Sequence, residues 1–246
     1  MRNMLKNVNP AILIIIALLL GNNLLNSNQS LGEWLFDQVL FLPAILVGLT
    51  FHEAAHGFAS YWLGDPTPKL QGRLSLNPLK HIDPIGFLAL FFAGFGWGKP
   101  VEINPFYYKN RRRDEIIVSL AGVVTNFVIA VISFFALKLI LIYFFSTPEP
   151  GAGALSNYGY ALLMIPTYMI QINIVLMVFN LIPVPPLDGF GVITQLFNLQ
   201  KYDWWYKIYS NGFLILMVLI LFDVTDMILG PAVSFIYGFL WDLIIG

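Results

Sequence analysis

Long apolar runs separated by shorter polar segments dominate the chain. A membrane-crossing helix needs about 20 predominantly apolar residues, and the runs that meet or approach this length are 10–25, 37–63, 115–145, 158–182, 206–222 and 226–243. The pattern therefore predicts an all-α polytopic membrane protein with about six transmembrane helices. The length of 246 residues suits a single membrane-embedded domain, 1–246, with its core at 37–192 and no soluble regulatory domain.

The first apolar run allows two interpretations. Arg2 and Lys6 precede an apolar core at 11–20, as in a secretory signal peptide. The following Gly21-Asn22-Asn23 lacks the small-residue pattern of a cleavage site. We therefore favour a retained anchor.

The segment 64–114 is too long and too structured in its pattern to be a simple loop. Its apolar stretch, 85–95, is too short to span a bilayer and ends in a glycine-rich run, which favours a re-entrant or interfacial piece. Residues 72–76 and 99–103 alternate apolar and polar positions, as strands do. The pattern predicts a small β segment at the membrane surface, with a basic loop on anionic headgroups as the open alternative.

Composition agrees with a membrane protein and narrows its partners. Hydrophobic residues make up 58% of the chain and charged residues 11%, which is too apolar for a soluble globular domain. The net charge of -1 gives no indication of a nucleic-acid partner, so the expected surroundings are the lipid bilayer. Cysteine is absent, so a bound metal must be held by His, Asp or Glu.

Basic residues predict the orientation, because cytoplasmic loops are enriched in Lys and Arg. Most of them fall in 64–114, whereas 26–36, 146–157 and 223–225 contain none. We therefore predict a multi-pass integral membrane protein with 64–114 and both termini on the cytoplasmic side. Lys138, near the outer end of its span, is expected to extend toward the headgroups.

The second apolar run contains His52-Glu53-Ala54-Ala55-His56. On a helix, residues four apart share one face, so His52 and His56 can bind one zinc ion while Glu53 remains free to act as a base. Ionisable side chains are costly in the middle of a membrane and usually mark a functional site. The alternative is a chance motif whose histidines only form hydrogen bonds.

A catalytic zinc usually takes three protein ligands, so one more donor is needed. The candidates are His81, Asp83 and Asp188. Asp188 follows the fourth run in a proline-rich turn, where Gly189 permits an unusual backbone that can turn the carboxylate back into the bundle. A simple turn aspartate is the alternative.

The chain resembles the site-2 protease family of intramembrane zinc metalloproteases, in its compact prokaryotic branch. The resemblance rests on His52-Glu53-x-x-His56, on Asn180-x-x-Pro183-x-Pro185-x-Leu187-Asp188-Gly189, and on 72–86 and 96–101. It implies that Asp188 is the third ligand of one zinc ion per chain and that His81 and Asp83 have positioning roles. It also implies a prokaryotic cell membrane and a membrane-spanning protein substrate.

The third run contributes Ala121-Gly122-Val123-Val124-Thr125-Asn126, which is similar to a family pattern that has proline where Val123 stands. The resemblance implies that Asn126 assists catalysis, and its amide can donate to a developing oxyanion. A hydrogen bond between helices is the alternative. Asn180 can support the proline-rich turn or bind an extended substrate backbone.

The leading hypothesis is zinc-dependent hydrolysis of peptide bonds in or near transmembrane segments, as in regulated intramembrane proteolysis. Zinc lowers the pKa of its water, Glu53 takes the proton, and the oxyanion is stabilised by zinc and Asn126. One alternative is a metal or proton transporter, and the other is a catalytically inactive scaffold that binds membrane helices. The ligand set is also compatible with iron. The sequence does not identify the substrate or the oligomeric state.

Overall fold

The computed structural model of the chain describes residues 30–93, 97–146 and 157–246. Within this part the protein is helical and contains no β-strand. Its long helices are α2 (Leu31–Trp62), α5 (Arg111–Ser146), α6 (Asn157–Leu181) and α10 (Val224–Ile244). Each of the four contains a stretch long and apolar enough to cross a membrane, and the bent pair of α8 (Asp203–Ser210) and α9 (Gly212–Leu221) would make a fifth if it counted as one span.

Helix α2 begins with a complete capping box. Ser30 Oγ accepts a hydrogen bond from the Glu33 main-chain N–H at 3.3 Å, and Glu33 Oε2 accepts one from the Ser30 N–H at 2.8 Å. This arrangement satisfies donors that the first turn of a helix leaves free. The helix then runs to Trp62 through the HExxH residues, with Pro43 inside it.

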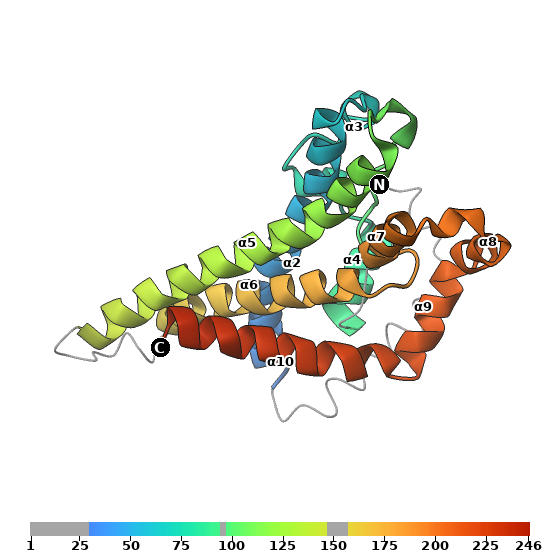
Figure 1. The fold of residues 1–246 in the computed structure, drawn as a ribbon. Helices are drawn as coiled ribbons and strands as arrows, with labels where there is room; N and C mark the ends of the chain where they lie inside the picture. Colours follow the sequence, from blue (N-terminus) through green and yellow to red (C-terminus); the bar gives the residue numbers. More distant parts are fainter. Residues whose placement is uncertain (1–29, 94–96, 147–156) are drawn as a thin grey trace, which may run out of the picture.

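Helices α2, α5 and α6 form the centre of the molecule. Each of the three packs against both of the others, and α10 lies along α5 and α6 (Figure 1). The largest buried cluster joins α5, α6 and α10 through Phe134, Ile170, Ile174 and Leu240, among others. Predominantly apolar helices packed in this way define an all-α polytopic membrane protein.

The segment between α2 and α5 contains helices and turns instead of the expected strands. It comprises α3 (Thr67–Leu70), the 3-10 turns η2 (Pro78–Lys80) and η3 (Pro105–Tyr107), and α4 (Pro84–Ala93). An isolated antiparallel bridge between Ile82 and Gly98 is the β pairing among the described residues. Residues 72–76 and 99–103 are not strands, because the Arg73 guanidinium occupies carbonyl groups that a neighbouring strand would need, those of Lys99 and Pro100.

Helix α4 corresponds to the apolar stretch predicted to be re-entrant or interfacial. Leu90 packs against Ile45 and Leu49, which lie in the middle of α2, with Phe87 and Phe91 beside it. The short helix therefore lies alongside a membrane-length helix at some depth, as a re-entrant piece does.

A buried polar cluster fixes the end of α2. Asp65 accepts hydrogen bonds from the Ser60 hydroxyl at 2.8 Å and from the main-chain N–H groups of Thr67 and Asn104 at 2.9 and 2.7 Å. Burial opposes ionisation, but these hydrogen bonds outweigh it and hold the pKa of Asp65 below its usual value. Burial also raises the pKa of Tyr108, whose hydroxyl contacts Ser60, to about 12.

The predicted run 206–222 is not one continuous helix. Helices α8 and α9 are bent by 62° at a short break, and α9 alone has ten residues. The predicted first span, 10–25, lies outside the described residues, so the count of six helices stays a prediction.

The C-terminal end lies at the end of the bundle opposite to 64–114. Lys138 Nζ, about 40 Å along α5 from Arg111, donates a hydrogen bond to the carbonyl of Ile244. At the other end of α10, Leu229 packs near Ile182 and Leu187, which follow α6. The C-terminal end and the segment 64–114 thus lie at opposite ends of α5. The predicted shared side stays a prediction, because it depends on whether the bent pair of α8 and α9 crosses the membrane. The predicted side of the N-terminus lies outside the described residues.

Candidate metal centre

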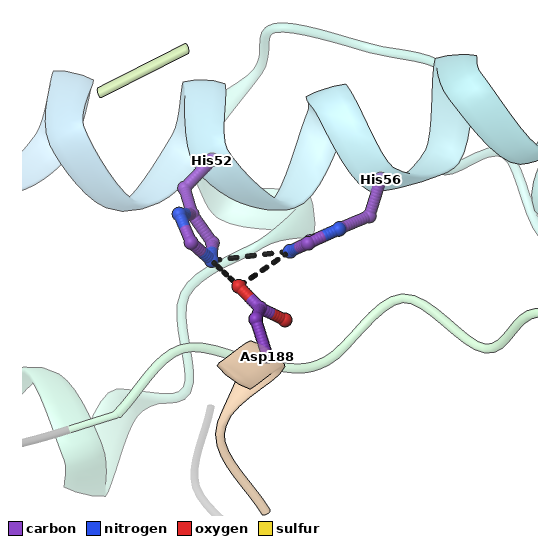
Figure 2. A group of neighbouring side chains, drawn as sticks. All are labelled: His52, His56 and Asp188. Carbon is purple, nitrogen blue, oxygen red and sulfur yellow. Dashed lines mark hydrogen bonds and ion pairs between the residues drawn. The ribbon is translucent and has the colours of Figure 1, made fainter. Parts of the chain in front are cut away.

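Three of the predicted site residues converge between α2 and α7 (Asp188–Phe197). His52 Nε2 and His56 Nε2 are 3.1 Å apart, and Asp188 Oδ2 lies 3.2 Å from the first and 3.4 Å from the second (Figure 2). A tetrahedral ion with ligand bonds of about 2.0–2.2 Å holds its ligand atoms about 3.3–3.6 Å apart. The three distances, 3.1 to 3.4 Å, are at or slightly below this range, so the group is close to the size that one zinc ion requires.

The hydrogen bonds around the two histidines leave their Nε2 atoms free for a metal. His52 Nδ1 lies 2.6 Å from Asn126 Oδ1, and His56 Nδ1 lies 2.7 Å from the carbonyl oxygen of Val118. Both partners are acceptors, so each imidazole carries its proton on Nδ1. The lone pairs of both Nε2 atoms then point toward Asp188, whose Oδ2 is buried without a hydrogen-bond partner.

Gly122 allows α5 to approach the histidines closely. A Cβ atom at this position would lie 2.5 Å from His52 Cε1 and 2.6 Å from His56 Nε2. A larger residue would therefore displace the ligands. Gly122 belongs to the run 121–126, but its contact with the histidines is not predictable from the sequence pattern.

The proline-rich turn after α6 brings Asp188 to the site as the first residue of α7. Gly189 does not have a positive φ, so the expected unusual backbone is not the reason for glycine here. A Cβ atom on Gly189 would lie 2.2 Å from the carbonyl oxygen of Leu181. Glycine is needed because the turn folds tightly against the end of α6.

Glu53 lies beside the metal group. Its Oε2 accepts a hydrogen bond from the main-chain N–H of Val101 at 3.0 Å. Glu53 and the three ligands line one cleft of about 390 Å³. The cleft is also lined by apolar side chains, which include Leu49, Trp97, Leu176, Phe179, Phe213 and Leu216. A second and more apolar hollow between α2 and α5 contains no titratable group, so the chemistry belongs to the smaller cleft.

The other two candidates for the third ligand lie outside the metal group. His81 is fully buried, and its Nε2 contacts the carbonyl oxygen of Ser75 at 2.7 Å. Burial lowers the pKa of His81. Asp83 accepts hydrogen bonds from the N–H groups of Ile85 and Gly86 at the start of α4.

Asn126 contacts the metal group in a different way from the oxyanion role. Its Nδ2 donates to the carbonyl of Gly48 at 3.2 Å and to Asn173 Oδ1 at 2.7 Å. Both amide hydrogens are thus used inside the bundle, and an oxyanion would have to displace one of these bonds. Asn173, which the sequence reasoning did not single out, joins the site through this contact. Asn180 lines the cleft, and its amide donates to the Leu176 carbonyl in its own helix.

The fold and the site together define a class, the membrane-embedded zinc metalloproteases of HExxH type. The chain is 37% identical over 207 residues to the protein named "Putative zinc metalloprotease YwhC" of Bacillus subtilis (strain 168). The matched residues make up 80% of this chain and 91% of that protein. It is 32% identical over 189 residues to "Putative zinc metalloprotease Rip2" of Mycolicibacterium smegmatis, and the matched residues make up 74% of this chain and 67% of that protein. No protein-family model and no solved structure matches the chain. The chain belongs to the site-2 protease-like family of zinc metalloproteases.

Proposed function

We propose that this protein hydrolyses peptide bonds in or near the transmembrane segments of other membrane proteins. The observation that carries the proposal is that Asp188 meets His52 and His56 beside Glu53. The two histidines and Glu53 lie on α2, which is long and apolar enough to cross a bilayer. A zinc ion held by His52, His56 and Asp188 would supply Lewis-acid polarisation and would acidify a water molecule. Every other task falls to side chains of this chain.

Glu53 acts as the general base and then as the general acid. Its carboxylate takes a proton from the attacking water and later delivers one to the leaving amine. The Val101 N–H holds one carboxylate oxygen at 3.0 Å and so fixes the direction of the other. His52, His56 and Asp188 hold the metal, and Asn126 orients His52.

The mixed lining of the cleft suits a membrane-derived substrate. The cleft contains the titratable groups together with apolar side chains such as Leu176, Phe179 and Leu216. An unwound piece of a transmembrane segment offers a main-chain carbonyl to the titratable groups and apolar side chains to the apolar lining. We propose that the basic segment 64–114 faces the cytoplasm, so that the site opens toward that side.

The test compares Glu53→Gln with wild type. We expect Glu53→Gln to retain zinc and to lose cleavage by about 10²-fold or more, because a positioned base typically contributes that much. Metal analysis of the purified proteins and comparative proteomics of membrane peptides from cells expressing each form measure the two effects. Glu33→Gln is the matched control on the same helix, because glutamine preserves its capping box.

Normal cleavage by Glu53→Gln would contradict the mechanism. Zinc flux into proteoliposomes by wild type, without cleavage of any membrane peptide, would favour a transporter instead. Loss of zinc from Asp188→Ala would support the ligand set, and full retention would contradict it.

A further inference from the structure

Two buried asparagine side chains connect the metal group to α6. Asn126 on α5 and Asn173 on α6 are both fully buried. Hydrogen bonds run from His52 to Asn126 at 2.6 Å, from Asn126 to Asn173 at 2.7 Å, and from Asn173 to the carbonyl of Met169 at 2.8 Å. The chain of contacts thus passes through all three central helices and ends at a proposed metal ligand.

The direction of each hydrogen bond in this chain follows from the bond between Asn173 and the Met169 carbonyl. Asn173 Nδ2 donates to the Met169 carbonyl, so Asn173 presents Oδ1 to Asn126. Asn126 must then present Nδ2 to Asn173 and to the Gly48 carbonyl, and Oδ1 to His52. His52 responds by keeping its proton on Nδ1.

The opposite orientation of Asn126 would place its oxygen against two other oxygens, those of Asn173 and Gly48. It would also present an N–H group to His52 Nδ1, which would then have to be an acceptor. The His52 proton would move to Nε2 and block the atom that faces Asp188. The amide orientation therefore decides whether His52 can bind a metal.

We propose that Asn173 is a positioning residue for the metal centre. It holds the Asn126 amide in the orientation that selects the metal-binding tautomer of His52. This inference rests on the proposed function, because it takes His52 to be a ligand. Full burial of both amides means that water does not easily replace a lost partner.

The first test measures zinc affinity by chelator competition on the purified full chain. We expect Asn173→Leu, which is similar in size but has no hydrogen-bonding atoms, to weaken zinc binding by about 10- to 100-fold, as loss of an outer-shell partner typically does. We also expect a changed visible spectrum of the Co²⁺-loaded protein. Thr167→Val is the matched control, because Thr167 donates to the Leu163 carbonyl in the same helix and should leave affinity and spectrum unchanged.

Two rescue variants separate positioning from mere packing. Asn173→Asp, protonated in its buried position, can still donate to Met169 and accept from Asn126, so it should restore most of the affinity. In Asn126→Asp, also protonated in its buried position, the hydroxyl can donate to the Gly48 carbonyl while the carbonyl oxygen accepts from His52, so the contact to His52 no longer depends on Asn173. Adding Asn126→Asp to Asn173→Leu should therefore bring zinc affinity back toward that of wild type, which a purely structural role would not do.

Unchanged affinity and Co²⁺ spectrum in folded Asn173→Leu would overturn the inference, and so would failure of both rescue variants. His52→Ala distinguishes the two levels of the argument. If His52→Ala loses zinc while Asn173→Leu binds zinc with wild-type affinity, only the role of Asn173 is contradicted. Full zinc affinity in His52→Ala would instead defeat the proposed ligand set, and the inference with it.

Discussion

At the scale of single residues, the proposed general base, Glu53, depends on a side chain that does not touch it. The Arg73 guanidinium, which is buried, donates to the main-chain carbonyls of Lys99 and Pro100. The next residue, Val101, donates its N–H to Glu53. Arg73 therefore fixes the piece of backbone that orients Glu53, and it does so with two hydrogen bonds from one planar group.

We expect Arg73→Met to lower kcat by roughly 10- to 100-fold while zinc content stays at the wild-type level, because a misplacement of about 1 Å can cost that much. Arg73→Lys should recover only part of the rate, since a flexible ammonium group does not hold its N–H groups in the fixed plane from which Nη2 donates to both carbonyls. Lys80→Met serves as the control, because Lys80 is an exposed residue of the same segment that contacts the Gly72 carbonyl. Loss of zinc in Arg73→Met would instead mean that Arg73 supports the metal ligands.

At the scale of elements, α7 carries Asp188 at one end and is clamped at the other. Arg112 on α5 donates to the carbonyls of Gln195 and Leu196 in the last turn of α7. The Trp205 indole N–H donates to Thr194 Oγ1 at 2.9 Å. A cation at the C-terminal end of a helix satisfies free carbonyls and the helix dipole together.

This clamp predicts an effect on metal binding from a residue far from the metal. Helix α7 has ten residues, or about 15 Å, so a rotation of about 5° at the clamp moves Asp188 by about 1 Å. We expect Arg112→Met to weaken zinc binding by roughly tenfold, within the range for outer-shell changes. Arg113→Met should have no effect, because Arg113 pairs with Asp114 on its own helix. Chelator competition measures both, and equal affinities would contradict the role of the clamp.

The elements also show which structural features can be predicted from local sequence patterns and which cannot. The long spans and the HExxH face were predictable because each depends on local periodicity, and the resemblance identified Asp188. The break in 206–222 was not predictable from the sequence pattern, because it depends on a contact with a residue distant in the chain. A Cβ atom on Gly212 would lie 2.5 Å from Pro185 Cβ, so α9 begins where it packs on the proline-rich turn. The same holds for α7 and for the pairing of Asn126 with Asn173, since both depend on which helices become neighbours.

At the scale of the whole molecule, the bent pair of α8 and α9 decides on which side of the membrane the rest of the chain lies. Each full crossing reverses the side, so counting 206–222 as a span placed the C-terminal end beside 64–114. In the structure, α10 runs antiparallel to α6, and its last turn contacts α5 near Lys138 (Figure 1). Charge counting therefore predicts the side of 64–114 from local evidence, whereas the side of the C-terminus also depends on whether 206–222 crosses the membrane.

The absence of cysteine makes this topology directly testable, because each introduced cysteine is the only thiol in the chain. Lys109→Cys marks the basic segment, Tyr158→Cys marks the exposed start of α6, and Gly246→Cys marks the end of α10. In intact cells, a membrane-impermeant maleimide should label positions 158 and 246 but should label 109 only after the membrane is opened, if positive residues face the cytoplasm. Labelling of 246 together with 109 would mean that α8 and α9 make a full crossing in the membrane. Labelling of 109 alone in intact cells would instead reverse the orientation and place the opening of the metal cleft on the outer side.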